Sequence, residues 1–183
     1  METPIVIENE EQAKHLLRRL SSVQRSVFGL DCETVGIDPT KQAPGCGLGR
    51  IFCWSLSWFE GPTDKYATRA YLARETLPTF KSWLEDNQVK KVGHNIFGFD
   101  RHMFLNEGIN LQGIVGDTLH MSKLVYNHPD MRHGLKPLSK SILGYDMKDY
   151  KELFSRPKRL LDKVNKKSKH HVVDGIPTYT LGS

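Results

Sequence analysis

The chain contains the run Gly29-Leu30-Asp31-Cys32-Glu33-Thr34, which follows the apolar pair Val27-Phe28. Apolar residues of this kind predict a buried β-strand. Because side chains alternate across a strand, Asp31 and Glu33 share one side and Cys32 faces the other. The two carboxylates then lie about 7 Å apart, taking a rise of roughly 3.3 Å per residue. A divalent cation would neutralise this pair, because hard cations prefer carboxylate oxygens. The alternative is an acidic turn at the end of the strand.

Asp100 is a second acid that the pattern places toward the interior. Apolar residues lie three or four positions from it on a helix predicted over residues 95–107: Phe97, Met103 and Phe104. An acid on the inward face of a helix needs a partner. Asp100 would either join Asp31 and Glu33 around a metal ion, or form a salt bridge or a helix cap. The small polar run His94-Asn95 favours the first alternative, since open α/β sheets place their sites where strands end.

The periodicity of the whole chain predicts a mixed α/β arrangement. Three strands joined by a loop and a turn come first and indicate an antiparallel meander: 27–34, 50–58 and 65–72. A short strand over 4–8 and a helix capped by Asn9 precede them. After them, strands over 91–95 and 111–115 alternate with helices over 75–86, 95–107, 117–126 and 135–143. Asp117 has the position of a helix N-cap, which is a structural role.

Length and composition favour one globular domain without membrane segments. The chain has 183 residues, of which 38% are apolar. No apolar run approaches the roughly 18 residues of a membrane span. The N-terminus lacks the basic start and apolar stretch of a signal peptide. The three cysteines form no C-x-x-C pair, which fits a reducing compartment and no zinc site. We therefore expect a cytoplasmic protein.

The positive charge is concentrated at the C-terminal end. Residues 156–183 contain seven Lys or Arg and two Asp, which account for the whole net charge of +5. A basic tail can hold nucleic acid through phosphate contacts and counterion release. The alternative is a solvated, partly disordered segment. We expect a folded domain over residues 1–150 and a basic, partly disordered tail over 151–183.

Four short motifs follow one another along the chain: Asp31-Cys32-Glu33-Thr34 with Gly36, His94-Asn95 with Phe99-Asp100, Gly116-Asp117-Thr118, and the run from His133 to Tyr145. In this order they resemble the DnaQ-like 3′–5′ exonucleases, and they are most similar to the proofreading domain of phage family A DNA polymerases. The resemblance covers residues 27 to about 150. It implies a ribonuclease H-like fold, with a mixed sheet flanked by helices.

The resemblance also implies a site and its chemistry. Asp31, Glu33 and Asp100 would hold two divalent cations, Mg²⁺ or Mn²⁺, that act in an in-line displacement. Thr34 and Asn95 would help to orient the terminal nucleotide. The remaining candidate for a substrate contact is Phe99, which either packs the helix or stacks a base. The expected substrate is the 3′ end of single-stranded DNA, with no membrane partner.

One departure from the family pattern concerns a fourth acid, which the family carries on a later helix after a Tyr or His. Asp174 stands four residues after His170, but Asp174-Gly175-Ile176-Pro177 is typical of a turn, and Pro177 opposes a helix there. We therefore expect a chain that lacks its fourth acidic ligand, either a fragment or split part of a DNA polymerase, or a module that a polymerase polypeptide completes in trans.

Two other functions stay open at this stage. The first is a catalytically incomplete remnant that binds DNA or a polymerase partner, which the missing acid favours. The second is another ribonuclease H-like nuclease that cuts internally or cuts RNA. The glycine-rich run Gly45-Cys46-Gly47-Leu48-Gly49 is not a phosphate-binding P-loop, because the Lys and Ser/Thr that should follow are absent.

Overall fold

A computed structural model describes residues 4–23, 27–35, 49–61, 64, 67–128, 130–147, 171–173 and 176–178. Its contacts divide the chain into two units, Met1–Met131 and Arg132–Ser183. The expected loop over 36–49, which includes Gly36 and Cys46, lies outside the described residues except for Gly49. The first unit contains the sheet that the sequence predicts.

The described strands of the first unit form a six-stranded mixed sheet in the order β1-β4-β3-β2-β5-β6. Its strands are β1 (Ile5–Ile7), β2 (Val27–Val35), β3 (Arg50–Trp58), β4 (Thr68–Ala73), β5 (Lys90–Gly93) and β6 (Ile114–Asp117). The pairs β2–β3 and β3–β4 are antiparallel, which confirms the predicted meander. The pairs β1–β4, β2–β5 and β5–β6 are parallel.

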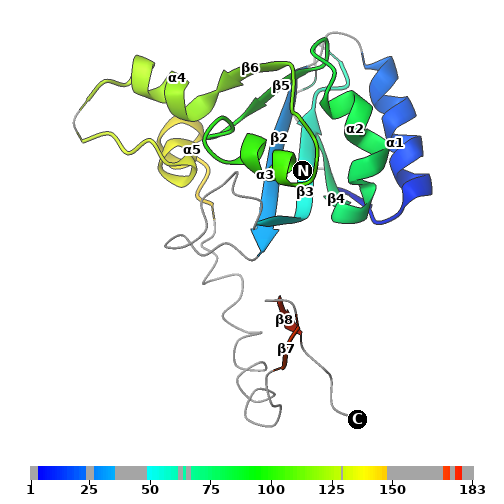
Figure 1. Cartoon of the computed structure of the whole chain (residues 1–183). Coiled ribbons are helices and arrows are strands. Elements are labelled where there is room, and N and C mark those ends of the chain that lie inside the picture. Colours follow the sequence, from blue (N-terminus) through cyan, green and yellow to red (C-terminus); the bar gives the residue numbers. More distant parts are fainter. Residues whose placement is uncertain are drawn as a thin grey trace. The chain divides into compact units, whose positions relative to one another are not determined.

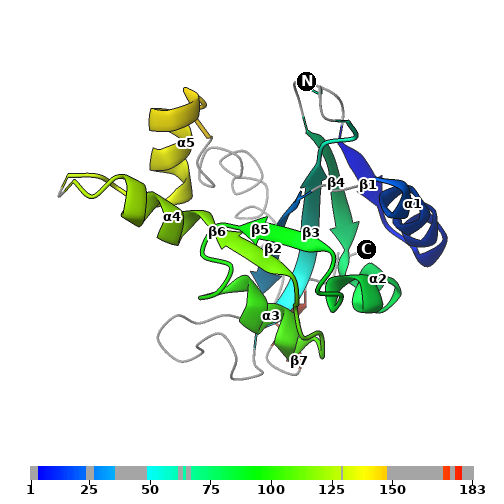
Figure 2. The ribbon, with the colours of Figure 1, turned by 90° about the horizontal axis from the view of Figure 1, so that it is seen from above.

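Helices pack on one face of this sheet. They are α1 (Glu10–Ser22), a 3₁₀ turn (Arg74–Thr76), α2 (Leu77–Leu84) and α3 (Asp100–Asn106), and α4 (Thr118–Val125) follows β6. Figures 1 and 2 show α1 and α2 side by side and α3 against β2 and β3. The Trp54 ring of β3 meets Phe80 of α2 and Phe104 of α3 edge-on, with centroids 5.0 and 6.1 Å apart. One hydrophobic core therefore joins the sheet to its helices.

The start of α1 follows the sequence pattern. The Asn9 side chain accepts a hydrogen bond from the backbone amide of Gln12, as an N-cap does. Ala13, Leu16 and Leu20 are buried, as the expected apolar stripe requires.

Other element bounds differ from expectation. The helix predicted over 95–107 begins only at Asp100, and residues 95–99 form turns. Phe97 lies outside the expected apolar stripe, since 42% of it is exposed. The strand predicted over 111–115 is β6 (Ile114–Asp117), and it lies at the sheet edge as expected.

The second unit contains α5 (Leu135–Leu143), with the predicted bounds and with Gly144 in the left-handed conformation (φ 64°) as its C-cap. It also contains two short antiparallel strands, β7 (His171–Val173) and β8 (Ile176–Thr178), inside the segment expected to be a tail. The boundary after residue 150 stays a prediction. None of the helices in the described ranges has both the length and the apolar character that a membrane crossing requires.

Candidate functional site

Strand β2 presents Asp31 and Glu33 on the face opposite to the core. Leu30 and Cys32 are buried toward the helices, whereas Asp31 and Glu33 are exposed. Across the ladder Asp31 pairs with Ser55 and Glu33 with Cys53. The register shifts between Glu33 and Thr34, which indicates a β-bulge. The expected alternation along this strand is confirmed.

Asp100 reaches the edge of the same strand from the first position of α3. It is only 2% exposed, and its Oδ1 accepts a hydrogen bond of 2.9 Å from the backbone amide of Cys32. Strand β5 pairs with β2 only as far as Gly29, so the described strands leave this edge of β2 open at Cys32. The carboxylate of Asp100 therefore lies beside the strand segment that carries Asp31 and Glu33.

The three carboxylates repel one another. Within the described ranges, none of the three forms an ion pair with Lys, Arg or His. Burial raises the pKa of Asp100 to about 6, and the Asp31 carboxylate adds to this effect, while hydrogen bonds from Cys32 oppose it. Although Asp31 is exposed, partial desolvation by neighbouring atoms and the Glu33 carboxylate raise the pKa of its side chain. Burial together with these acids also raises the pKa of the Cys32 thiol. The cluster thus carries negative charge that no described side chain balances.

This donor set suits a hard divalent cation, which prefers carboxylate oxygens and would relieve the repulsion. However, in the described part of the chain no three His, Cys, Asp or Glu side chains stand together in metal-binding geometry. A cation would therefore have to draw these side chains closer together. The chemistry of the three side chains therefore fits a metal site. That they move together to bind an ion stays a prediction.

The three residues expected to contact substrate are close to these acids in the sequence, and each has its own structural surroundings. Thr34 is partly buried at the β-bulge of β2. Asn95 has a left-handed backbone (φ 60°), and its side-chain oxygen lies over Gly98, where an added Cβ would come within 2.5 Å. Phe99 is the N-cap residue of α3 and packs against the hydrophobic core. For Phe99 the packing role is therefore the one that its surroundings support.

Asp117 has more partners than the sequence suggested. Its predicted role as N-cap of α4 is confirmed by the bond from the Leu119 amide to Oδ1 at 3.0 Å. The same Oδ1 accepts from the Asn95 amide at 2.8 Å, and Oδ2 accepts from the Phe97 amide at 3.3 Å. Nδ1 of His120 lies 3.3 Å from Oδ2. The capping pattern indicated the first bond, and no local signal indicated the bonds to a loop 20 residues earlier.

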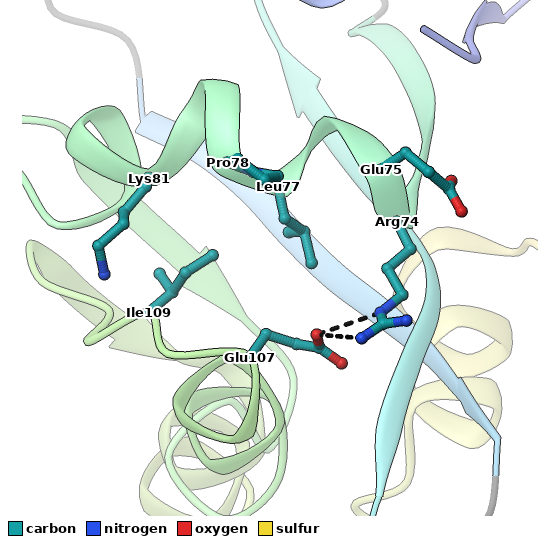
Figure 3. A pocket seen from close by; sticks show the side chains of 7 residues that line it. All are labelled: Arg74, Glu75, Leu77, Pro78, Lys81, Glu107 and Ile109. Carbon is teal, nitrogen blue, oxygen red and sulfur yellow. Dashed lines mark hydrogen bonds and ion pairs between the residues drawn. The ribbon is translucent and has the colours of Figure 1, made fainter. Parts of the chain in front are cut away.

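A cavity of about 290 Å³ lies at the other end of α3 (Figure 3). It is lined by Arg74, Glu75, Leu77, Pro78, Lys81, Glu107 and Ile109. Oε2 of Glu107 accepts two hydrogen bonds from the Arg74 guanidinium at 2.9 and 3.1 Å, and Oε1 accepts one from the Ile51 amide at 3.0 Å. These contacts connect α3 with β3. The cavity contains none of the three acids on β2 and α3.

Comparison with known proteins agrees with this fold. The family model for the 3′–5′ exonuclease of family A DNA polymerases matches residues 4–163. DNA polymerase I B, chloroplastic/mitochondrial, of Arabidopsis thaliana is 30% identical over 164 residues, which are 82% of this chain and 16% of that protein. DNA polymerase I A, chloroplastic/mitochondrial, of the same plant is 30% identical over 130 residues, 66% of this chain and 12% of that protein. The chain thus spans a small part of the length of these relatives.

Solved structures share the fold at low identity. Trypanosoma brucei RNase D has a TM-score of 0.61 at 16% identity, covering 85% of this chain and 52% of that one. Brucella melitensis NrnC with bound Mg²⁺ has a TM-score of 0.55 at 19% identity, covering 91% and 83%. The expected ribonuclease H-like fold is confirmed. Since the family model covers most of the chain, the chain belongs to the 3′–5′ exonuclease family of the family A DNA polymerases.

Proposed function

We propose that the chain is a proofreading-type exonuclease domain that removes 3′-terminal nucleotides from single-stranded DNA with the help of divalent cations. One observation carries the proposal: the Asp100 carboxylate bonds to the backbone of Cys32, between Asp31 and Glu33. This bond attaches an acid 68 residues further along the chain to the strand segment that carries Asp31 and Glu33. Acids rarely gather in this way without a counter-charge unless a cation joins them.

Each residue has a distinct role in this proposal. Asp31, Glu33 and Asp100 hold Mg²⁺ or Mn²⁺, and the Cys32 amide keeps Asp100 at the strand edge. Two such ions, when bound, supply activation of a water and stabilisation of the leaving 3′ oxygen. Thr34 and Asn95 orient the terminal nucleotide, and Phe99 supports them by packing α3. Proposed partners are the 3′ end of single-stranded DNA and a polymerase polypeptide, and the proposed compartment is the cytoplasm of a bacterial or phage-infected cell.

The number of acids decides between an active nuclease and a remnant that only binds. Asp174, the candidate for a fourth acid, lies between β7 and β8 and outside the described residues. With three carboxylates, one ion is held well and the second keeps fewer anionic ligands. We therefore expect the isolated chain to bind single-stranded DNA weakly and to degrade it slowly. Mn²⁺ should support more activity than Mg²⁺, which demands near-ideal geometry.

The test is digestion of 3′-labelled single-stranded DNA, and of RNA of the same sequence, by the purified chain with Mg²⁺, Mn²⁺ or EDTA. Asp31→Ala should abolish the metal-dependent loss of 3′ nucleotides. Glu10→Ala, which removes an exposed acid paired with Lys14 on α1, should leave it unchanged. A polymerase polypeptide with a Tyr-x-x-x-Asp motif, added in trans, should raise the rate.

Three results would contradict parts of the proposal. Faster loss of RNA than of DNA would favour the other ribonuclease H-like nucleases. Rapid digestion that Asp174→Ala leaves unchanged would show that no fourth acid is needed. Metal-independent DNA binding without digestion, even with the added polypeptide, would identify a remnant that binds without cutting.

A further inference from the structure

The loop between β5 and α3 is held by an acid from a different element, the strand β6. Asp117 is 3% exposed, and its two oxygens together accept the amides of Asn95, Phe97 and Leu119 and lie near His120. Burial raises the pKa of the Asp117 carboxyl, but these bonds outweigh burial and hold the pKa below its usual value. The side chain is therefore an anion that accepts bonds from the loop and from α4 at once.

The loop has little freedom to find another conformation. Asn95 has a φ of 60°, which is uncommon for a residue other than glycine. A Cβ at Gly93, the last residue of β5, would lie 2.9 Å from the Leu30 carbonyl and 2.8 Å from Ile96, so the chain packs tightly on β2 where the loop begins. The amides of Gly98 and Phe99 donate to the Asn95 carbonyl at 3.0 and 2.9 Å. The turn at Asn95 thus sets the path of the chain up to the first residue of α3.

Helix α3 continues from this turn without a break. The Arg101 amide donates to the Ile96 carbonyl, and the amides of His102 and Met103 donate to the Phe99 carbonyl. Between these residues lies Asp100, whose carboxylate must reach the Cys32 amide. A shift of the turn would move Asp100 along the strand edge, because the bonds connect the two directly.

We propose that Asp117 is a positioning residue for the acidic site, which it aligns through Asn95 and the start of α3. The part of this proposal that is tested by metal binding rests on the proposed function. The alignment of Asp100 can be tested without metal. Asp117 itself touches neither Asp31 nor Glu33 in any described contact. It acts on the site through the loop, as second-layer partners of metal ligands do.

The decisive variant is Asp117→Ser, because serine is a good N-cap for α4 but its single short oxygen cannot also hold the loop. Asn9→Ala is the matched control, since it removes the N-cap of α1 and leaves the loop untouched. Amide hydrogen exchange by NMR and titration with Mn²⁺ alone are measured on the full chain. If the serine variant does not fold, Asp117→Asn, which keeps the side-chain volume, replaces it.

In Asp117→Ser, the amides of Asn95 and Phe97 should exchange about ten-fold faster, because each loses a bond to a carboxylate. The Cys32 amide should also exchange faster, although Asp117 does not touch it. Mn²⁺ affinity should fall by about 10- to 100-fold. In Asn9→Ala, neither the Cys32 exchange nor the Mn²⁺ affinity should change.

Unchanged Cys32 exchange in Asp117→Ser, with faster exchange only at Asn95 and Phe97, would overturn the proposal and leave Asp117 as a local cap. Loss of Cys32 protection with unchanged Mn²⁺ affinity would also overturn it, because the ion would not depend on the alignment. If the wild-type chain binds no Mn²⁺ at all, the proposed function fails, and the Cys32 exchange alone decides whether Asp117 positions Asp100.

Discussion

Asp100 is an acid in the interior that has no described cation beside it. A buried carboxylate is tolerated when it is protonated, hydrogen-bonded or joined by a metal ion. Here the backbone amide of Cys32 bonds to Oδ1, and the Cys32 thiol and the amide of Asp100 itself also favour the carboxylate, but burial still raises the pKa to about 6. In the absence of metal, the folded state therefore holds a proton on Asp100 that the unfolded chain has already lost at the same pH.

This difference predicts how the stability of the metal-free chain depends on pH. Because the folded pKa exceeds the ordinary value of 3.8, Asp100 stabilises the fold least when it is ionised. Its contribution to the free energy of unfolding should fall as the pH rises from about 4 to about 6, by up to about 3 kcal/mol. Urea unfolding in EDTA measures it as the difference between the wild-type chain and Asp100→Asn across these pH values.

The control for this comparison is Asp146→Asn, which removes an exposed carboxylate paired with Lys140 on α5. Because this carboxylate is exposed, its replacement should not reproduce the fall in stability that Asp100 causes. At pH 7, Mn²⁺ should stabilise the wild-type chain and should stabilise Asp100→Asn much less. Equal pH profiles for wild type and Asp100→Asn would contradict the raised pKa.

Single residues also show where prediction from sequence reaches its limit. The inward position of Asp100 followed from its helical spacing, and the shared face of Asp31 and Glu33 followed from strand alternation. The burial of Lys91 had no such signal. Its side chain is fully buried, with Nζ donating to the carbonyls of Asp86, Val89 and Gln112 at 2.9 to 3.2 Å. The burial of this lysine depends on where turns distant in the sequence place their backbone carbonyls. No local sequence pattern contains that information.

At the scale of elements, α3 is joined to the sheet at both ends by carboxylates that accept backbone amides. Asp100 accepts from Cys32 of β2 at the start, and Glu107 accepts from Ile51 of β3 just after the end. The side chain of Glu107 is only 8% exposed and also pairs with Arg74. The helix has seven residues, too few for stability on its own, so these bonds and the packing below them hold it in place.

Glu107→Gln should therefore destabilise the chain by about 1–3 kcal/mol, because a bond between charged groups is lost and the Ile51 amide receives a weaker acceptor. Glu75→Gln is a suitable control. Glu75 lines the same cavity, but its exposed side chain points away from Glu107 (Figure 3). Urea unfolding at pH 7 compares the two, and we expect Glu75→Gln to change the free energy of unfolding by less than about 0.5 kcal/mol. Equal losses would show that the carboxylate of Glu107 does not hold α3.

The start of α3 is the element boundary that the sequence misplaced most. Apolar spacing through residues 95–107 predicted a continuous helix, and the low helix propensity of Gly98 near its start was too weak a signal to overrule that spacing. The turn arises from contacts that lie outside this window, since Asp117 accepts the amides of Asn95 and Phe97 and Gly93 packs on Leu30. Tertiary contacts of this kind override periodicity. By contrast, α5 matched its predicted bounds, because Gly144 ends it locally.

At the scale of the whole molecule, the order of elements was the best predicted feature. The antiparallel meander followed from loop and turn residues between three strand-like runs, and the edge position of β6 followed from its short apolar run. The parallel pairing of β1 with β4 was not predicted, because strands far apart in the sequence can pair in several ways. A division between units after Met131 also had no sequence signal.

The last prediction concerns the distribution of charge over the whole chain. Residues 1–155 balance to zero, so the net charge of +5 belongs to residues 156–183. The proposed site itself is acidic, and it repels the phosphates of a DNA strand until cations bind. Long-range attraction for DNA must then come from another part of the molecule, and the basic segment is the candidate that the sequence offers.

Each Lys or Arg that contacts a phosphate of single-stranded DNA adds about 0.7 to the slope of log affinity against log salt. Replacing Lys166 and Lys167 with Gln should therefore lower this slope by up to about 1.4, and removing residues 156–183 should lower it further. Lys14→Gln with Arg18→Gln removes the same charge from the exposed side of α1. If the basic segment supplies the phosphate contacts, this variant should leave the slope unchanged. Fluorescence anisotropy with a labelled single strand between 50 and 200 mM salt provides the measurement. Over this range, six phosphate contacts to a single strand would change the affinity by about 300-fold. An equal drop in both variants would mean that only net charge attracts DNA, and no drop in either would place the phosphate contacts elsewhere in the chain.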